Sequence, residues 1–260
     1  MTIFEAIILG FVQGMTEFLP VSSSGHLVLL QKVFGINEGA MLFTIMLHVG
    51  TLISIFIVFW EDIMDMIKNP LNKLSILIIS ATIPTVLIAL LLQDVVEEAF
   101  DSATTLGFGF LLTGIILWTV ESIKLGNKEL KEMTFLNALL IGTAQGLAIF
   151  PAISRSGATI AGALFQNLDR RFAAKFSFLM SIPAILGSLI FQMKDIVGTE
   201  LNIDWIPVII GTLVAAASGY LAIRFMMEMI AKKSLKYFSI YVFILGGIVL
   251  LDQYFFGWVF

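Results

Sequence analysis

Residues 9–28 read LGFVQGMTEFLPVSSSGHLV, and residues 141–160 read IGTAQGLAIFPAISRSGATI. Both stretches are apolar, and each is interrupted near its middle, the first by Pro20 and a run of serines, the second by Pro151 and Ser-Arg-Ser. The apolar segments that contain them, 2–34 and 134–167, are thereby split into halves that are too short to cross a bilayer. Each segment therefore predicts a re-entrant helix-loop-helix hairpin whose break lies inside the membrane.

The two stretches also match each other without gaps when one is placed directly beneath the other. The identical positions are Gly10 and Gly142, Gln13 and Gln145, Gly14 and Gly146, Phe18 and Phe150, Ser22 and Ser154, Ser24 and Ser156, and Gly25 and Gly157. Such self-similarity indicates an internal repeat. We expect a single membrane domain of residues 1–260, with repeats of approximately 1–121 and 134–258.

The composition agrees with a membrane protein. Of the 260 residues, 58% are hydrophobic and 13% are charged, and the mean hydropathy is +0.99. A net charge of −4 offers no basic surface for nucleic acid, so we expect none to bind. The absence of Cys excludes disulfides and thiolate metal sites. Residues 3–19 lack the basic flank and the cleavage pattern of a removable signal peptide, so we expect them to stay in the protein.

Six further stretches are long and apolar enough to span a bilayer, namely 40–60, 74–93, 104–121, 172–193, 205–227 and 237–258. A hairpin returns to its own side, whereas three spans cross to the other side, so the second repeat begins on the opposite face. The predicted fold is an all-α integral membrane protein of six transmembrane helices and two re-entrant helix-loop-helix hairpins, arranged as two inverted-topology repeats. In such folds the broken helices meet near the midplane, where helix N-termini can bind an anion.

The distribution of Lys and Arg predicts the orientation. Of the 15 basic residues, Arg155 lies in the second hairpin, and only two, Lys32 and Lys194, lie on one side. The other twelve share the opposite side: Lys68, Lys73, Lys124, Lys128, Lys131, Arg170, Arg171, Lys175, Arg224, Lys232, Lys233 and Lys236. We therefore expect a multi-pass protein of the bacterial plasma membrane with both termini extracytoplasmic. The first hairpin then enters from outside, and the second from the cytoplasm.

The first break contains two ionisable residues, Glu17 and His26, which are costly to bury at membrane depth and so predict function. Gln13 and Glu17 are four residues apart and share one helix face, where they could hold a hydrated or phosphate-bound divalent ion. A structural alternative for Glu17 is an ion pair with Arg155 that merely joins the hairpins. His48, inside the first span, is interpreted as a packing or interhelical hydrogen-bonding group.

The second break supplies an arginine and hydroxyl groups. Arg155 offers a planar fork for phosphate oxygens, and Ser154, Ser156 and Thr159 add hydrogen-bond donors beside a helix start. At the matched break, the three serines at 22–24 either contact substrate or cap the helix that starts near Gly25. We predict substrate binding by these loop residues and by Gln13, and catalysis by a smaller set. The predicted substrate-binding residues are Gln13, Ser22, Ser24, Ser154, Ser156 and Thr159.

The block QGMTEFLPVSSSGH (13–26) and the block PAISRSGAT (151–159) resemble the two signature motifs of the bacterial undecaprenyl-diphosphate phosphatase family, also called the bacitracin-resistance family. The similarity extends over the whole chain and includes the number of spans. It implies release of inorganic phosphate from undecaprenyl diphosphate, which recycles the lipid carrier for peptidoglycan synthesis, and hence roles in cell wall biogenesis, cell shape and bacitracin resistance. It also implies a divalent cation, Mg²⁺ or Ca²⁺, bound with the diphosphate.

The resemblance also carries residue roles by position. The predicted catalytic residues are Glu17, Ser23, His26 and Arg155, with Glu17 also the metal ligand. Two positions depart from the family pattern. Gln13 stands where many members have Glu, which removes one carboxylate ligand, and Ala152 stands where Gly is usual after the proline.

The sequence thus predicts a hydrolase acting on a phosphoric anhydride, at a midplane site open to the extracytoplasmic side. Its expected partners are undecaprenyl diphosphate and bilayer lipid, and a homodimer is compatible with the architecture. The alternative is a transporter or flippase for phosphate or a lipid phosphate, since inverted repeats with broken helices are common among carriers. A carrier has less use for Glu17, Ser23 and His26 together. The pattern does not choose between a serine nucleophile and an activated water, or between acid and base roles for His26.

Overall fold

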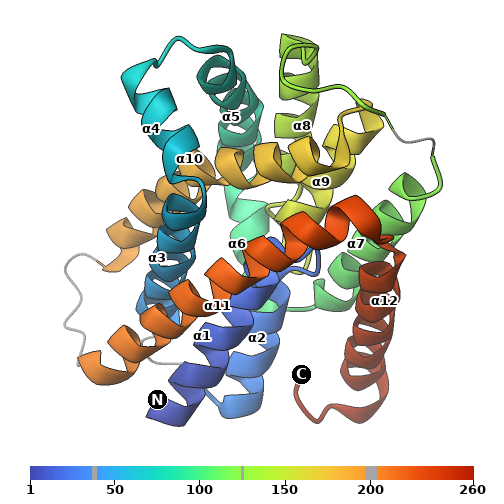
Figure 1. Cartoon of the computed structure of the whole chain (residues 1–260). Coiled ribbons are helices and arrows are strands. Elements are labelled where there is room, and N and C mark those ends of the chain that lie inside the picture. The colour runs from blue at the N-terminus through green and yellow to red at the C-terminus, as the bar shows by residue number, and fades with distance from the viewer. Residues whose placement is uncertain (37–39, 124–125, 197–203) are drawn as a thin grey trace.

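A computed structural model describes residues 1–36, 40–123, 126–196 and 204–260, and Figure 1 shows its architecture. In these ranges the regular secondary structure is entirely helical. The helices are α1 (Ile3–Phe18), α2 (Ser23–Phe34), α3 (Ala40–Val58), α4 (Trp60–Lys68), α5 (Lys73–Leu91), α6 (Gln93–Ser102), α7 (Leu106–Val120), α8 (Phe135–Leu147), α9 (Arg155–Phe165), α10 (Arg170–Ile196), α11 (Trp205–Lys232), α12 (Lys236–Leu251) and a π-helical turn, Asp252–Phe256.

The two predicted helix breaks are confirmed. Helix α1 ends shortly before Pro20, whose ring is incompatible with a continuing helix, and Ser22 caps the start of α2 by accepting a hydrogen bond from the Gly25 amide. The second hairpin repeats this arrangement. Helix α8 ends before Pro151, and Ser154 caps α9 by accepting from the Gly157 amide. The capping interpretation of the serine run therefore holds for Ser22.

Five helices are long and apolar enough to cross a membrane: Ala40–Val58, Lys73–Leu91, Arg170–Gln192, Trp205–Lys232 and Lys236–Phe256. They coincide with five of the six predicted spans. The sixth predicted span, 104–121, is the helix α7, which is apolar but has 15 residues. The multi-pass, all-helical class is confirmed, and the sixth crossing stays a prediction because α7 is shorter than the five spans.

The two hairpins are held by reciprocal packing. Helix α1 lies on α11, where a side chain at Gly10 would collide with the Gly211 carbonyl and one at Gly14 with the Ser218 hydroxyl. Helix α8 lies on α5, where a side chain at Gly142 would collide with the Ala81 carbonyl. Small residues allow backbones to approach this closely without a large side chain between them. The repeated Gly10 and Gly142 thus position both hairpins.

One ion pair joins the ends of three neighbouring segments of the bundle. Arg170 donates from Nη1 to Glu121 Oε1 at 2.8 Å, and from Nε to the Ile230 carbonyl at 2.6 Å. The second oxygen of Glu121 accepts from the Leu235 amide at 2.9 Å. Burial alone would raise the pKa of Glu121, but the hydrogen bonds from Arg170 and Leu235 hold the pKa of this carboxyl below its ordinary value. The pair therefore ties α7, α10 and the α11–α12 turn together.

Glu121→Gln is expected to lower the free energy of unfolding by about 2 kcal/mol at pH 7, because charged hydrogen bonds are lost while side-chain volume is kept. The depressed pKa means that this contribution is fully present above the unfolded value of about 4.3 and is lost as pH falls through the folded value. Thermal melting in detergent at pH 7 and pH 4 measures it. The exposed Glu228→Gln serves as control. Equal melting of Glu121→Gln and wild type at pH 7 would contradict the prediction.

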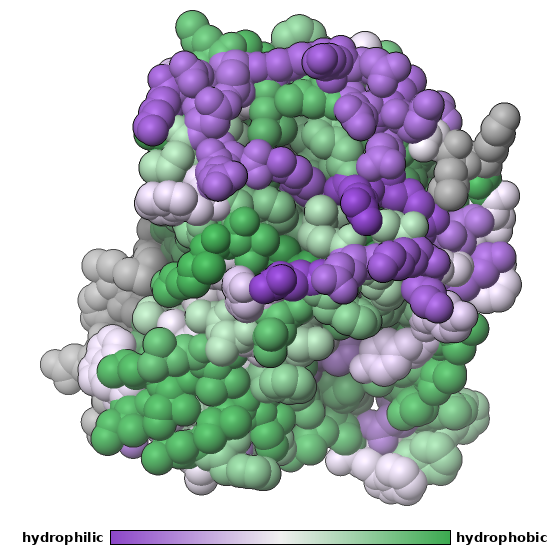
Figure 2. All heavy atoms as spheres, in the orientation of Figure 1, coloured by the Kyte–Doolittle hydropathy of each residue, from purple (hydrophilic) through white to green (hydrophobic). Residues whose placement is uncertain are grey.

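The face of the molecule drawn in Figure 2 is polarised. In Figure 2 hydrophilic residues crowd the upper part of the molecule, whereas the lower part, where α1, α2 and both termini lie in Figure 1, is mostly hydrophobic. The first hairpin thus occupies the less polar side, and α8 of the second hairpin reaches the polar side. Of the twelve basic residues assigned to one side, Lys124 lies outside the described residues.

Candidate active site

The tips of the two hairpins meet inside the protein. The Ser156 hydroxyl donates to the Leu19 carbonyl at 3.0 Å, so the start of α9 touches the end of α1. Helix α7 supports the second tip, since the Thr113 hydroxyl donates to the Ala152 carbonyl at 3.1 Å and accepts from the Ser154 amide at 3.0 Å. The two breaks, which lie in opposite halves of the sequence, therefore form one centre.

Glu17 is the hub of this centre, and its side chain is 6% exposed. Arg155 donates from Nη2 to Oε1 of Glu17, forming an ion pair between the hairpins. The other oxygen, Oε2, accepts from the Ser23 hydroxyl at 2.5 Å and from Gln13 Nε2 at 3.0 Å. The structure thus brings together four of the predicted site residues: Gln13, Glu17, Ser23 and Arg155.

Two polar atoms of this cluster are buried without a hydrogen-bond partner among the described residues. They are Nη1 of Arg155, which is a donor, and Oε1 of Gln13, which is an acceptor. A buried unpaired polar atom is costly, and in a native protein it points to a missing ligand, ion or water. The centre therefore has an unused donor at Arg155, which suits an anion, and an unused acceptor at Gln13, which suits a donor or a cation.

His48 is a member of the centre that the sequence analysis did not assign to it. Its Nε2 lies 3.9 Å from Glu17 Oε2, and its Nδ1 donates to the Thr44 carbonyl at 2.8 Å. The approach to Glu17 of α1 agrees with the interpretation of His48 as an interhelical polar group. It also places His48 beside the central carboxylate of the site. The signal that could have assigned His48 to the site is that it is an ionisable residue within a predicted span.

His26 faces away from this cluster. Its Nδ1 lies 2.7 Å from the Ser22 carbonyl, and its Nε2 lies 2.8 Å from the hydroxyl of Tyr241, on α12. Within the described part of the chain, no hydrogen bond joins His26 to Glu17 or Ser23, although all three lie in the same hairpin. Tyr241 was missed by the sequence analysis, because no sequence pattern relates residues so far apart along the chain.

The other predicted substrate-binding residues already have partners within the protein. Ser22 and Ser154 are helix caps, and their hydroxyls pair with Ser24 and Ser156 respectively, each at 3.2 Å. Thr159 is fully buried, with its hydroxyl 2.5 Å from that of Ser177 on α10. The structure therefore places Thr159 behind the loop, and contact of these residues with substrate stays a prediction.

Ala152 is one of the two departures from the family pattern, since Gly is usual at this position. Its φ of 62° lies in the left-handed region that favours glycine. The residue is buried, and its Cβ occupies the space that side chains at Gly25 and Gly109 would need. The loop before Arg155 thus adopts a glycine-type conformation with an alanine, which costs about 1 kcal/mol or more.

The residues of the centre suit a divalent ion only if substrate phosphate and water supply its other ligands. Among the described residues, no three His, Asp or Glu side chains gather into a metal-binding group. The available oxygens are the carboxylate of Glu17 and the unpartnered Oε1 of Gln13. Mg²⁺ characteristically combines one or two protein oxygens with waters and substrate phosphates, and this donor set suits that mode.

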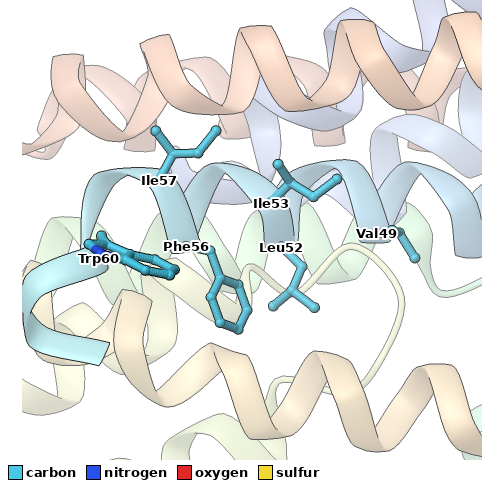
Figure 3. A pocket seen from close by; sticks show the side chains of 6 residues that line it. All are labelled: Val49, Leu52, Ile53, Phe56, Ile57 and Trp60. Atoms are coloured by element: carbon cyan, nitrogen blue, oxygen red, sulfur yellow. The ribbon is translucent and has the colours of Figure 1, made fainter. Parts of the chain in front are cut away.

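An apolar recess lies on the face of α3, directly after His48 in the chain (Figure 3). It measures about 590 Å³ and is lined by Val49, Leu52, Ile53, Phe56, Ile57 and Trp60. Apart from the indole nitrogen of Trp60, these side chains carry no polar group, so the recess has no chemistry of its own. It is suited to hydrocarbon.

The chain is similar to known proteins over nearly its whole length. Residues 6–248 match the family model described as bacitracin resistance protein BacA. A protein of Carboxydothermus hydrogenoformans named undecaprenyl-diphosphatase is 53% identical, over 97% of this chain and 98% of its own. Proteins of the same name from Halothermothrix orenii and Alkaliphilus metalliredigens are 46% and 45% identical, each over 96% of this chain and 98% of their own.

Proposed function

The chain belongs to the bacitracin resistance (BacA) family and hydrolyses undecaprenyl diphosphate to undecaprenyl phosphate and inorganic phosphate, and we propose that it does so at the Glu17–Arg155 centre. The observation that carries the site is the buried, unpartnered Nη1 of Arg155 at the meeting point of the two hairpins. A guanidinium with one free nitrogen offers a directed donor to a phosphate oxygen. Phosphate release from undecaprenyl diphosphate by the purified protein tests the activity.

The centre supplies the two things that phosphoryl transfer needs, which are positioning and charge stabilisation. Arg155 and the amides at the start of α9 receive the diphosphate, while Glu17 orients Arg155 and Ser23. A Mg²⁺ or Ca²⁺ ion held by Glu17, Gln13 and the diphosphate would neutralise further phosphate charge. Substrate entry rearranges these contacts, since both oxygens of Glu17 have partners without it.

The hydrogen bond from Ser23 to Glu17 supports Glu17 as the proton acceptor for a serine nucleophile. In that route Ser23 Oγ bonds to the terminal phosphorus, its proton passes to Glu17, and the bond from that phosphorus to the bridging oxygen breaks. Undecaprenyl phosphate leaves, and water then releases inorganic phosphate from the serine. The alternative is direct attack by water. Trapping of a phosphoenzyme separates the two routes, because only the first forms one.

The geometry of the centre fits a transporter less well than a phosphatase. Binding of a phosphate headgroup requires Arg155 and the loop amides, but not a serine hydroxyl held 2.5 Å from a buried carboxylate. The relatives' names also describe a phosphatase. We keep transport only as a second activity that follows hydrolysis.

We propose that the fold consists of two inverted repeats, approximately 1–121 and 134–258, with α7 as the third crossing of the first repeat. The reciprocal packing supports this arrangement. The alignment that pairs Gly10 with Gly142 relates α1 to α8 and α5 to α11, and α1 packs on α11 while α8 packs on α5. A two-fold axis in the membrane plane produces such paired contacts and brings the broken helices together at mid-depth.

The proposed location is the bacterial plasma membrane, with both termini extracytoplasmic, because the twelve-to-two basic bias assigns the polar side to the cytoplasm. The chain ends lie on the same side of the molecule in Figure 1. We expect a periplasm-type reporter, such as alkaline phosphatase, to be active when fused after Phe260. Activity of only a cytoplasmic reporter at that position would contradict the orientation.

A site that opens to the extracytoplasmic side receives a headgroup from the outer leaflet. The prenyl chain then stays in the hydrocarbon, along apolar surfaces such as the recess on α3. Hydrolysis thus takes place at the boundary between a charged centre and lipid.

A further inference from the structure

His26 is oriented by residues from three elements. Its ring is 7% exposed and stands edge-on to Phe110 of α7, at a centroid distance of 5.4 Å and an angle of 84°. The ring of Tyr241, on α12, is nearly parallel to it, at 5.7 Å and 9°. Both ring nitrogens of His26 have oxygen partners, Ser22 at Nδ1 and Tyr241 at Nε2.

These partners determine the tautomer. A backbone carbonyl only accepts hydrogen bonds, so Nδ1 of His26 carries a hydrogen and donates it to Ser22. In neutral His26, Nε2 is then an acceptor, and the Tyr241 hydroxyl donates to it. Tyr241 is 46% exposed, so the partner of the buried imidazole is itself a residue at the surface of the bundle.

The internal repeat shows that the fold itself does not require this pair. The alignment of the two halves relates His26 to Ala158 and Tyr241 to Gly109. Helices α9 and α7 also pack on each other, and the equivalent positions there carry neither an imidazole nor a phenol. The same alignment relates Glu17 to Ile149 and Arg155 to Ser23, so the proposed catalytic residues also occur in one copy only. The His26–Tyr241 pair thus occurs in one repeat only, as the proposed catalytic residues do, whereas the packing glycines occur in both repeats.

We propose that Tyr241 is a positioning residue for the hydrolysis, which acts through His26 by holding the orientation of its ring and the hydrogen bond at Nε2, while the Ser22 carbonyl fixes the tautomer. This inference rests on the proposed function, because it assigns His26 a role in proton transfer. The Tyr241 hydroxyl keeps its proton and donates a hydrogen bond to Nε2, so that His26 is neutral before hydrolysis, while Glu17 accepts the proton of Ser23. Loss of the hydroxyl would leave Nε2 without its partner and the ring held only through Nδ1.

The test compares Tyr241→Phe with Tyr237→Phe, one turn earlier on the same helix and 66% exposed. We expect Tyr241→Phe to lower kcat about tenfold with little change in KM, because it removes one hydrogen bond and keeps the ring. Tyr237→Phe should resemble wild type. In a His26→Gln background Tyr241→Phe should have no further effect, since its only route of action is already removed.

A second measurement does not depend on turnover. Nitrogen-15 NMR of His26 in nanodiscs should show the Nδ1-protonated tautomer in both proteins, and the Nε2 resonance should shift in Tyr241→Phe, which lacks the hydrogen bond to that nitrogen. Full kcat in folded Tyr241→Phe, an undiminished effect in the His26→Gln background, or an unchanged Nε2 resonance would each overturn the inference while wild type stays active. A wild-type protein that releases no phosphate would instead overturn the proposed function.

Discussion

Arg155→Lys is expected to lower the rate of phosphate release from undecaprenyl diphosphate by at least about 10²-fold, while the protein remains folded. The guanidinium has two tasks at the centre. Its Nη2 pairs with Glu17, which holds the hairpin tips together, and its buried Nη1 is free for a phosphate oxygen. A lysine ammonium is a point charge that can keep the first contact but cannot direct a second donor from the same plane.

The measurement is the steady-state rate for purified Arg155→Lys, with thermal melting to establish folding. Arg171→Lys is the matched control, since Arg171 is exposed and lies beyond the far end of α9. It should retain normal turnover. If Arg155→Lys also supports near-normal turnover, Arg155 acts through charge alone and the two-donor account of the site is wrong.

Local signals explain why much of the site could be predicted from the sequence. Pro20 and Pro151 interrupt otherwise continuous apolar segments, and a capping serine follows each, so both breaks could be placed within a short stretch. Gln13 and Glu17 are one helical turn apart, and their contact follows from that spacing. The repeat then indicated that the breaks meet, which the Glu17–Arg155 pair confirms.

The remaining features depend on contacts between distant segments. Tyr241 reaches His26 from α12, and the approach of His48 to Glu17 depends on how α3 packs beside α1. Neither contact has a sequence spacing that predicts it. Hydropathy alone also overestimated the helix at 104–121, because Thr104 and Thr105 lie in the turn before α7 and not in the helix.

The second large effect is expected at Glu17. Glu17→Gln should lower hydrolysis on the order of 10²-fold or more, whereas Gln13→Ala should lower it roughly tenfold. Glu17 provides the charge that orients Arg155 and accepts the Ser23 proton. Gln13 provides one hydrogen bond to Glu17 and one free oxygen. Gln13→Glu should retain activity, and it should bind a divalent ion more tightly if the ion lies between the two side chains.

These three variants should be compared as purified proteins across a titration of Mg²⁺ and of Ca²⁺. Binding of the metal without substrate gives a readout besides activity, and the order of affinity should be Gln13→Glu, wild type, Gln13→Ala, Glu17→Gln. Equal metal affinity in all four proteins would contradict the assignment of Gln13 and Glu17 as ligands.

Loss of activity in Glu17→Gln has a second explanation, which must be tested with it. Arg155 is largely buried, and removal of its partner charge leaves it unpaired, which costs roughly 3–5 kcal/mol of stability. The double variant Glu17→Gln, Arg155→Gln removes both charges and should melt at a higher temperature than Glu17→Gln alone. If the pair only joined the hairpins, the folded double variant would recover turnover together with stability. If Glu17 and Arg155 perform the chemistry, the double variant recovers its stability and releases no phosphate, and that is the result we expect.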